Sequence, residues 1–140
     1  MLQLYSVADT ENIVVEYLRL KSPMRGFYCK EPGCLPYIGL DYSLHSDRRL
    51  HRCVLAEELG HHFTTAGQHI TKRYYSTQDR LTLDKIEYKA LRWAANHLIP
   101  EDDLLDVIAS GLCEIWELAE EFDVTDEMMR FRMRLFGVRT

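Results

Sequence analysis

The sequence contains no long apolar run. None of its 140 residues belongs to an apolar stretch of the about 20 residues that a membrane-spanning helix needs. The segment from Met1 to Tyr5 also lacks the basic start and the apolar stretch of a secretory signal. We therefore expect a cytoplasmic protein that makes no contact with a membrane.

Positive charge is also in short supply. Seventeen Lys and Arg residues stand against 22 Asp and Glu residues, which gives a net charge of −5. Proteins that bind nucleic acid usually present a basic surface, so this balance argues against direct nucleic-acid binding. The phosphate-binding patterns G-x-x-x-x-G-K-[ST] and G-x-G-x-x-G are absent, as is the G-x-S-x-G of serine hydrolases.

Cysteine is sparse, with four residues in the chain. Because no secretion signal is present, we expect reduced thiols rather than disulfides. Cys29 and Cys34 flank a turn and could form half of a structural zinc site, but no second close pair completes it. Cys53 and Cys113 fall on apolar helical faces, so we expect both to be buried, inert thiols.

The apolar spacing predicts a mainly helical α+β protein. The predicted helices cover residues 9–21, 47–64, 84–98, 101–110, 114–122 and 126–136. Residues 24–44 hold short β-prone runs around Glu31-Pro32-Gly33, which indicates a small antiparallel sheet of two or three strands. Residues 65–82 are rich in turn formers and are expected to form a loop. Trp93 and Trp116 are expected in the core.

Repeats, low-complexity segments and linker-like stretches are absent. The length then predicts one domain over residues 1–140. Within it we expect a catalytic core at 1–100 and a C-terminal helical subregion at 101–140. The segment Leu118–Thr125 has the rhythm of a helix-turn-helix unit, and the helix after it carries Arg130, Arg132 and Arg134. The approach to that helix is strongly acidic, so packing or protein docking is favoured over recognition of DNA bases.

The most informative segment is Cys53–Thr65, with the sequence CVLAEELGHHFTT. Positions four residues apart share a helical face, so Glu57 and His61 project together. The segment is similar to the H-E-x-x-H helix of zinc peptidases, in which two histidines bind zinc and the glutamate is the general base. Here Glu57 stands at the position of the first histidine and Glu58 at the position of the base. The pattern predicts a metal site whose ligands include Glu57 and His61.

The other histidines are candidates for supporting roles. His62 lies about 100° around the helix from His61, so it is expected to support the site or to pack against the sheet rather than bind the same metal. Three further histidines could approach from neighbouring segments and supply a second nitrogen ligand. They are His45, His51 and His69.

Two later segments complete a larger pattern. The stretch from Glu87 to Pro100 has the form E-x-x-A-x-x-W-A-A-x-x-L-I-P, and Leu118–Thr125 has the form L-A-x-x-F-x-V-T. Together with the helix at 54–62, they resemble the ImmA/IrrE family of bacterial and phage metallopeptidases. The resemblance implies a zincin-like fold with a small sheet, an active-site helix, and a later helix that supplies Glu87 as the third metal ligand.

The resemblance also implies a substrate and a cofactor. Members of the family commonly cleave a helix-turn-helix repressor that controls a phage, another mobile element or stress genes. Zinc is the expected metal, although a set of one histidine and two carboxylates also suits manganese or iron. The rival function is a non-catalytic interaction protein on the same fold. The carboxylate of Glu57 favours this rival, whereas the presence of Glu58 favours the enzyme.

Overall fold

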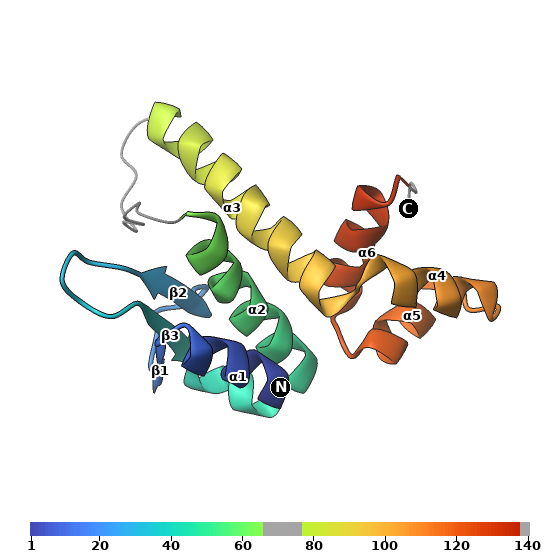
Figure 1. The fold of residues 1–140 in the computed structure, drawn as a ribbon, viewed down its shortest axis with the longest axis horizontal. Coiled ribbons are helices and arrows are strands. Elements are labelled where there is room, and N and C mark those ends of the chain that lie inside the picture. Colours follow the sequence, from blue (N-terminus) through green and yellow to red (C-terminus); the bar gives the residue numbers. More distant parts are fainter. Residues whose placement is uncertain (66–76, 138–140) are drawn as a thin grey trace.

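The computed structural model describes the backbone of residues 1–65 and 77–137, and the side chains of these residues except 77–84. Over this part of the chain the order of elements is α1 (Leu2–Thr10), β1 (Val14–Leu18), β2 (Gly26–Cys29), β3 (Tyr37–Asp41), the 3-10 helix η1 (Tyr42–Ser46), α2 (Arg48–Thr64), α3 (Thr77–Leu98), α4 (Glu101–Ala109), α5 (Ile115–Phe122) and α6 (Asp126–Leu135). Figure 1 shows these elements as a mainly helical α+β fold, which confirms the predicted class.

The start of the chain differs from the prediction. The helix expected at 9–21 is wrong, because α1 ends at Thr10 and β1 begins at Val14. Asn12 has a φ of 58°, a left-handed conformation that ends a helix. The β-branched residues Val14 and Val15 then pair with β3, with Val15 opposite Ile38. The apolar spacing after residue 12 is compatible with a helix, but pairing with β3 makes it a strand.

The sheet has three strands in the order β1-β3-β2. The predicted hairpin is confirmed, because β2 pairs antiparallel with β3. The expectation of a purely antiparallel sheet is wrong, because β1 runs parallel to β3. Consequently β2 lies at one edge of the sheet, on the side that contacts α2.

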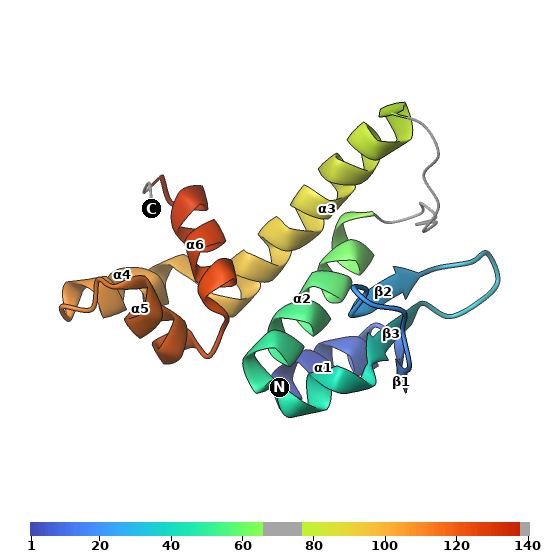
Figure 2. The same ribbon diagram turned by 180° about the vertical axis from the view of Figure 1, so that it is seen from behind.

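Helix α2 lies between the sheet and α3, as Figures 1 and 2 show. The side chain of Asp47 caps its first turn by accepting a hydrogen bond from the Leu50 amide. The contact between α2 and α3 is so close that a Cβ added to Gly60 would lie 2.3 Å from the carbonyl oxygen of Ala90. Only glycine at position 60 therefore allows the two helices to approach at this spacing.

Helix α3 is longer than predicted. The helix expected at 84–98 begins at Thr77. The loop expected at 65–82 was therefore predicted to end too late in the chain. Residues 66–76 of that loop lie outside the part of the chain that the structure describes. None of the described helices is long and apolar enough to cross a membrane.

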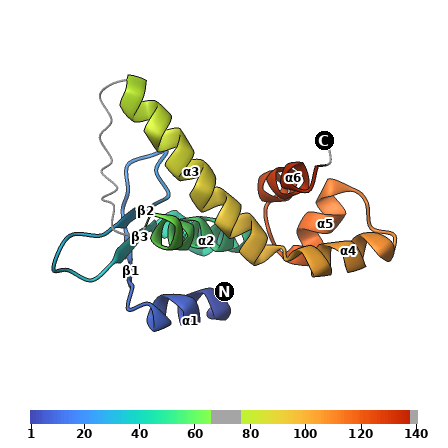
Figure 3. The same cartoon turned by 45° about the horizontal axis from the view of Figure 1, so that its top comes forward.

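The C-terminal helices gather at the end of α3 that is remote from the sheet, as Figure 3 shows. Helix α6 packs back against α3, and the buried Arg132 donates from Nε to the carbonyl oxygen of Ile99 at 2.8 Å. A second connection comes from Arg52 on α2, whose Nη1 donates to the carbonyl oxygens of Phe122 and Asp123 at 2.8 and 2.6 Å. These hydrogen bonds fix the C-terminal helices to α2 and to the end of α3.

Candidate metal centre

Glu57, His61 and Glu87 converge where α2 and α3 cross. Each side chain offers one ligand atom, and these atoms lie within 4.8 Å of one another. Nε2 of His61 lies 3.3 Å from Oε2 of Glu87. The crossing explains the convergence. Gly60, the residue before His61, packs against Ala90, which lies three residues after Glu87. The structure thus brings the three predicted ligands together.

The geometry of these side chains fits a divalent metal. Two ligands of one tetrahedral zinc, each at about 2.1 Å, lie roughly 3.4 Å apart. The 3.3 Å between His61 and Glu87 matches that separation. His61 is almost completely buried, and its Nδ1 has no hydrogen-bond partner among the described residues. One imidazole and two carboxylates form a donor set that zinc, manganese and iron all accept.

The two carboxylates of the site influence each other. Burial raises the pKa of Glu57 to about 7, and the negative charge of Glu87 adds to this shift. Burial alone would also raise the pKa of Glu87, but a hydrogen bond to His61 and the charge of its imidazole hold that pKa below its usual value. Without a cation, the pair therefore keeps a proton on Glu57 near neutral pH.

The predicted base, Glu58, follows Glu57 on α2 and lies about 100° around the helix from it, toward β2. It is 7% exposed, and a Cβ added to Gly26 of β2 would lie 3.3 Å from its Oε2. The carboxylate of Glu58 therefore lies against the edge strand, next to the point where Gly26 has no side chain. The sequence did not single out Gly26, because a lone glycine in a short strand has several explanations.

His62 packs against the sheet, which is one of the two roles expected for it. Its Nδ1 lies 2.8 Å from the Tyr28 hydroxyl of β2, and its Nε2 lies 2.9 Å from Oε1 of Glu11. Both ring nitrogens are engaged in this way. His62 therefore connects α2 to the sheet and to the end of α1.

The histidines considered as additional ligands lie elsewhere. Nε2 of His51 lies 2.8 Å from the Tyr17 hydroxyl and 3.3 Å from that of Tyr5, and the ring of His45 packs on Tyr17. Burial lowers the pKa of His51, and the charge of His45 lowers it further. Neither residue belongs to the metal-type group found in the described part of the chain. His69 lies outside the described residues.

The cysteines take no part in this group. All four are unpaired in the structure. Cys53 is buried as predicted, whereas Cys113 is exposed and the expectation for it is wrong. Cys29 is half-buried and Cys34 is exposed. The metal-type group found in the described part of the chain contains no cysteine.

A cavity borders the metal-type group. Its volume is about 290 Å³, and Glu57 forms part of its wall together with apolar side chains from α2, α3 and α6. Those side chains include Val54, Leu91 and Phe131. No local sequence pattern indicates this cavity, because its lining includes residues of three helices that are distant in the chain.

The fold and the group together define a metallopeptidase-type domain: a glutamate and a histidine on a helix beside a small sheet, with a second glutamate from the next helix. The family model described as IrrE N-terminal-like domain, of peptidase family M78, matches residues 8–134. The chain belongs to this family of metal-dependent peptidases, which confirms the predicted ImmA/IrrE relationship. No curated protein and no solved structure matches the chain significantly.

Proposed function

We propose that the protein is a metal-dependent endopeptidase. Glu57, His61 and Glu87 hold the metal, with zinc preferred over manganese or iron. The observation that carries the proposal is the convergence of these three side chains within 4.8 Å at the crossing of α2 and α3. When bound, a divalent metal supplies Lewis acidity toward a peptide carbonyl and toward water.

Glu58 acts as the general base in this proposal. It takes a proton from the attacking water and passes it to the leaving amine. Its buried carboxylate lies against Gly26 at the edge of the sheet. An extended peptide that adds to β2 would run past this carboxylate, because β2 is an edge strand that contacts α2. The position of Glu58 therefore supports both its role and an extended substrate.

The substrate in this proposal is a helix-turn-helix repressor of a phage or another mobile element. The support for it is the family relationship together with a sheet edge suited to an extended segment. We propose no direct contact with nucleic acid. The net charge of −5 supports this part of the proposal.

A non-catalytic interaction protein is the second candidate. The carboxylate of Glu57 favours it, because Glu57 stands where the usual zinc-peptidase motif has its first histidine. In that case the fold would bind its partner but leave peptide bonds intact.

Metal analysis followed by a cleavage assay separates the two candidates. Protein purified without added metal or chelator should contain about one equivalent of metal, and His61→Ala should contain almost none. His62→Gln is the matched control, because its ring lies on the same helix but bonds to Tyr28 and Glu11. It should retain the metal.

The outcome of these measurements decides between the candidates. Wild-type protein that is empty and takes up neither zinc nor manganese would refute the peptidase. If metal is present, the repressor encoded beside the gene is the first substrate to test. Cleavage by the wild type and its loss in Glu58→Gln would support the assignment of the base. Metal binding without cleavage of that repressor would refute the proposed substrate.

A further inference from the structure

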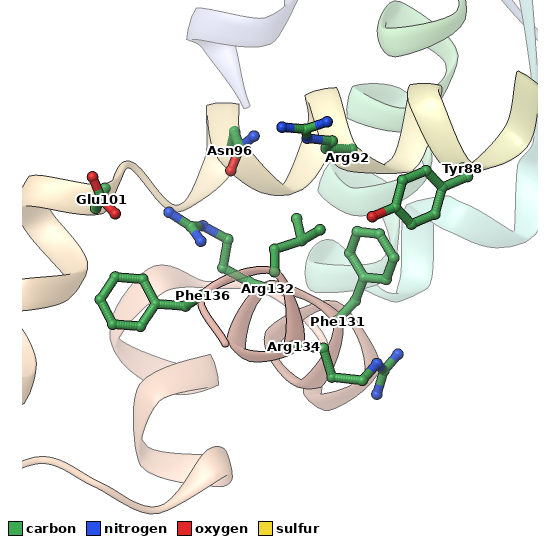
Figure 4. A pocket seen from close by; sticks show the side chains of 9 residues that line it. Tyr88, Arg92, Asn96, Glu101, Phe131, Arg132, Arg134 and Phe136 are labelled. Atoms are coloured by element: carbon green, nitrogen blue, oxygen red, sulfur yellow. The ribbon is translucent and has the colours of Figure 1, made fainter. Parts of the chain in front are cut away.

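A second and larger cavity lies on a different face of α3 from the metal-type group. Figure 4 shows it between α3, α6 and the start of α4. Its volume is about 670 Å³, within the range of roughly 300–1,000 Å³ that small-molecule sites occupy. Tyr88, Arg92 and Asn96 form its α3 wall at four-residue spacing. The cavity shares none of the three proposed metal ligands.

The lining of this cavity is basic in an acidic protein. Arg92, Arg132 and Arg134 contribute three positive charges, and Glu101 contributes one negative charge. None of the three arginines forms an ion pair within 4.0 Å with any residue that the structure describes. The cavity therefore carries positive charge that its own side chains do not fully balance.

Arg132 is the fixed element of the cavity. It is only 4% exposed, and its Nε donates to the carbonyl oxygen of Ile99. Its guanidinium lies 6.0 Å from the ring centre of Phe136, which also lines the cavity. In Figure 4 the guanidinium points from α6 toward the walls formed by α3 and α4. This contact with Ile99 holds the charged group in place before any ligand arrives.

We propose that this cavity binds a phosphorylated small molecule of mononucleotide size. Arg132 and Arg92 hold the phosphate, because the guanidinium fork matches phosphate oxygens and two arginines balance a dianion. The organic part of the ligand packs against the ring of Tyr88, one turn from Arg92 on α3. A phosphate alone would leave most of the 670 Å³ unfilled, so the cavity selects for the organic part as well.

A long nucleic acid does not fit the same observations. Its backbone needs an extended basic surface, whereas the protein carries a net charge of −5 and Arg132 is buried. The cavity also lies among helices on three sides, at α3, α6 and the start of α4. A discrete ligand matches this shape better than a polymer. The proposal is independent of the peptidase assignment, because it uses none of the residues of the metal centre.

Titration of the full-length protein tests this proposal. The probes are the 5′-monophosphates of adenosine, guanosine, cytidine and uridine, the four unphosphorylated nucleosides, and inorganic phosphate, measured by isothermal titration calorimetry. We expect at least one monophosphate to bind about tenfold or more tightly than both its nucleoside and inorganic phosphate. Nucleoside binding of equal affinity would refute the role of phosphate. Inorganic phosphate binding of equal affinity would refute a contribution of the organic part to binding.

Three variants locate the binding. Arg92→Ala and Arg132→Lys should each weaken the monophosphate about tenfold or more, because each removes a guanidinium contact. Arg130→Ala is the matched control, since Arg130 lies on α6 and is exposed but does not line the cavity. It should leave the affinity unchanged.

Two results would overturn the proposal. One is the absence of binding of all four monophosphates at millimolar concentration, and the other is an affinity that Arg92→Ala does not change. Arg132→Lys could destabilise α6 because it removes the bond to Ile99. Arg92 has no such bond in the structure, so Arg92→Ala decides the outcome if Arg132→Lys does not fold.

Discussion

Helix α3 separates two sites of opposite charge. On one face, Glu87 meets Glu57 and His61 of α2, and two carboxylates lie close together. On another, Tyr88, Arg92 and Asn96 meet the arginines of α6. Each site combines closely spaced residues of one helix with residues of a second helix: Glu57 and His61 with Glu87, and Tyr88, Arg92 and Asn96 with Arg132 and Arg134. The two sites use different residues of α3, although Phe131 and Arg134 of α6 line both the basic cavity and the smaller cavity beside Glu57.

The largest expected effect is at the base of the acidic site. Glu58→Gln should lower kcat/KM for the cleaved substrate by about 10²- to 10⁴-fold, because the amide cannot accept the proton. The metal content should stay unchanged, since Glu58 is not among the converging ligands. Single-turnover cleavage and elemental analysis of the same sample check both statements. Full activity in the variant would assign the base to another residue.

A change at Glu87 should weaken metal binding on one face of α3 and leave ligand binding in the basic cavity intact. Glu87→Gln should weaken metal binding by more than about 100-fold, because it removes a charged ligand. Binding of the monophosphate should not change. Arg92→Ala should give the reverse pattern. Metal competition titrations and calorimetry on both variants measure this, and a loss of both activities in either variant would contradict the separation of the two sites.

Enlarging Gly60 should damage the acidic site without touching a ligand. The Cβ in Gly60→Ala would lie 2.3 Å from the Ala90 carbonyl oxygen, so α2 and α3 must move apart. We expect a loss of about 1–3 kcal/mol in the free energy of unfolding and a reduced metal content. Asn96→Ala, on the exposed part of α3, should change neither. Urea unfolding and elemental analysis check this, and normal metal content in Gly60→Ala would contradict it.

Breaking the link between the two halves of the molecule should have a smaller effect. Arg52→Ala removes hydrogen bonds from α2 to the carbonyl oxygens of Phe122 and Asp123 and should cost about 1.5 kcal/mol of unfolding free energy. Arg49→Ala is the control, because its contact to Asp123 is 3.7 Å and exposed, and should cost well under about 1 kcal/mol. Equal losses by urea unfolding would refute the distinction.

The smallest effect concerns pH. His51 has a lowered pKa in the folded protein because it is buried, with a further contribution from His45. Protonation therefore favours the unfolded chain, so stability is complete above the unfolded pKa of about 6.5 and falls as the pH drops below it. His97 contributes in the same direction. Thermal unfolding between pH 7.5 and 5 should show a flatter profile for His51→Gln, and an unchanged profile would contradict this.

The sequence predicts Glu57, His61 and Glu87 as one group, and the structure brings a ligand atom of each within 4.8 Å of the others. The four-residue spacing puts Glu57 and His61 on one face of α2, and the resemblance to the family indicates Glu87. The spacing rule concerns one helix, and the resemblance adds a residue of the next. The close approach of α2 and α3 at Gly60 then brings Glu87 to Glu57 and His61.

Elsewhere, predictions from apolar spacing failed for a physical reason. Spacing reveals an apolar face but not the element that covers it. Trp116 was expected in the core and is 60% exposed, and Cys113 is exposed as well. The apolar spacing in β1 also suits a helix, and only the pairing with β3 makes this segment a strand. The basic cavity was not predicted, because Arg92 and Arg132 come together only when α6 folds back on α3.

The contact between Gly60 and Ala90 affects how activity can be inferred in related chains. A chain could keep all three metal ligands and the base, yet lose its metal because one methyl group was added between the helices. Conversely, a chain with a changed ligand, such as a carboxylate at position 57, keeps the distance between α2 and α3 that lets another donor set assemble. Whether a relative is a working enzyme therefore depends on a position that carries no functional group.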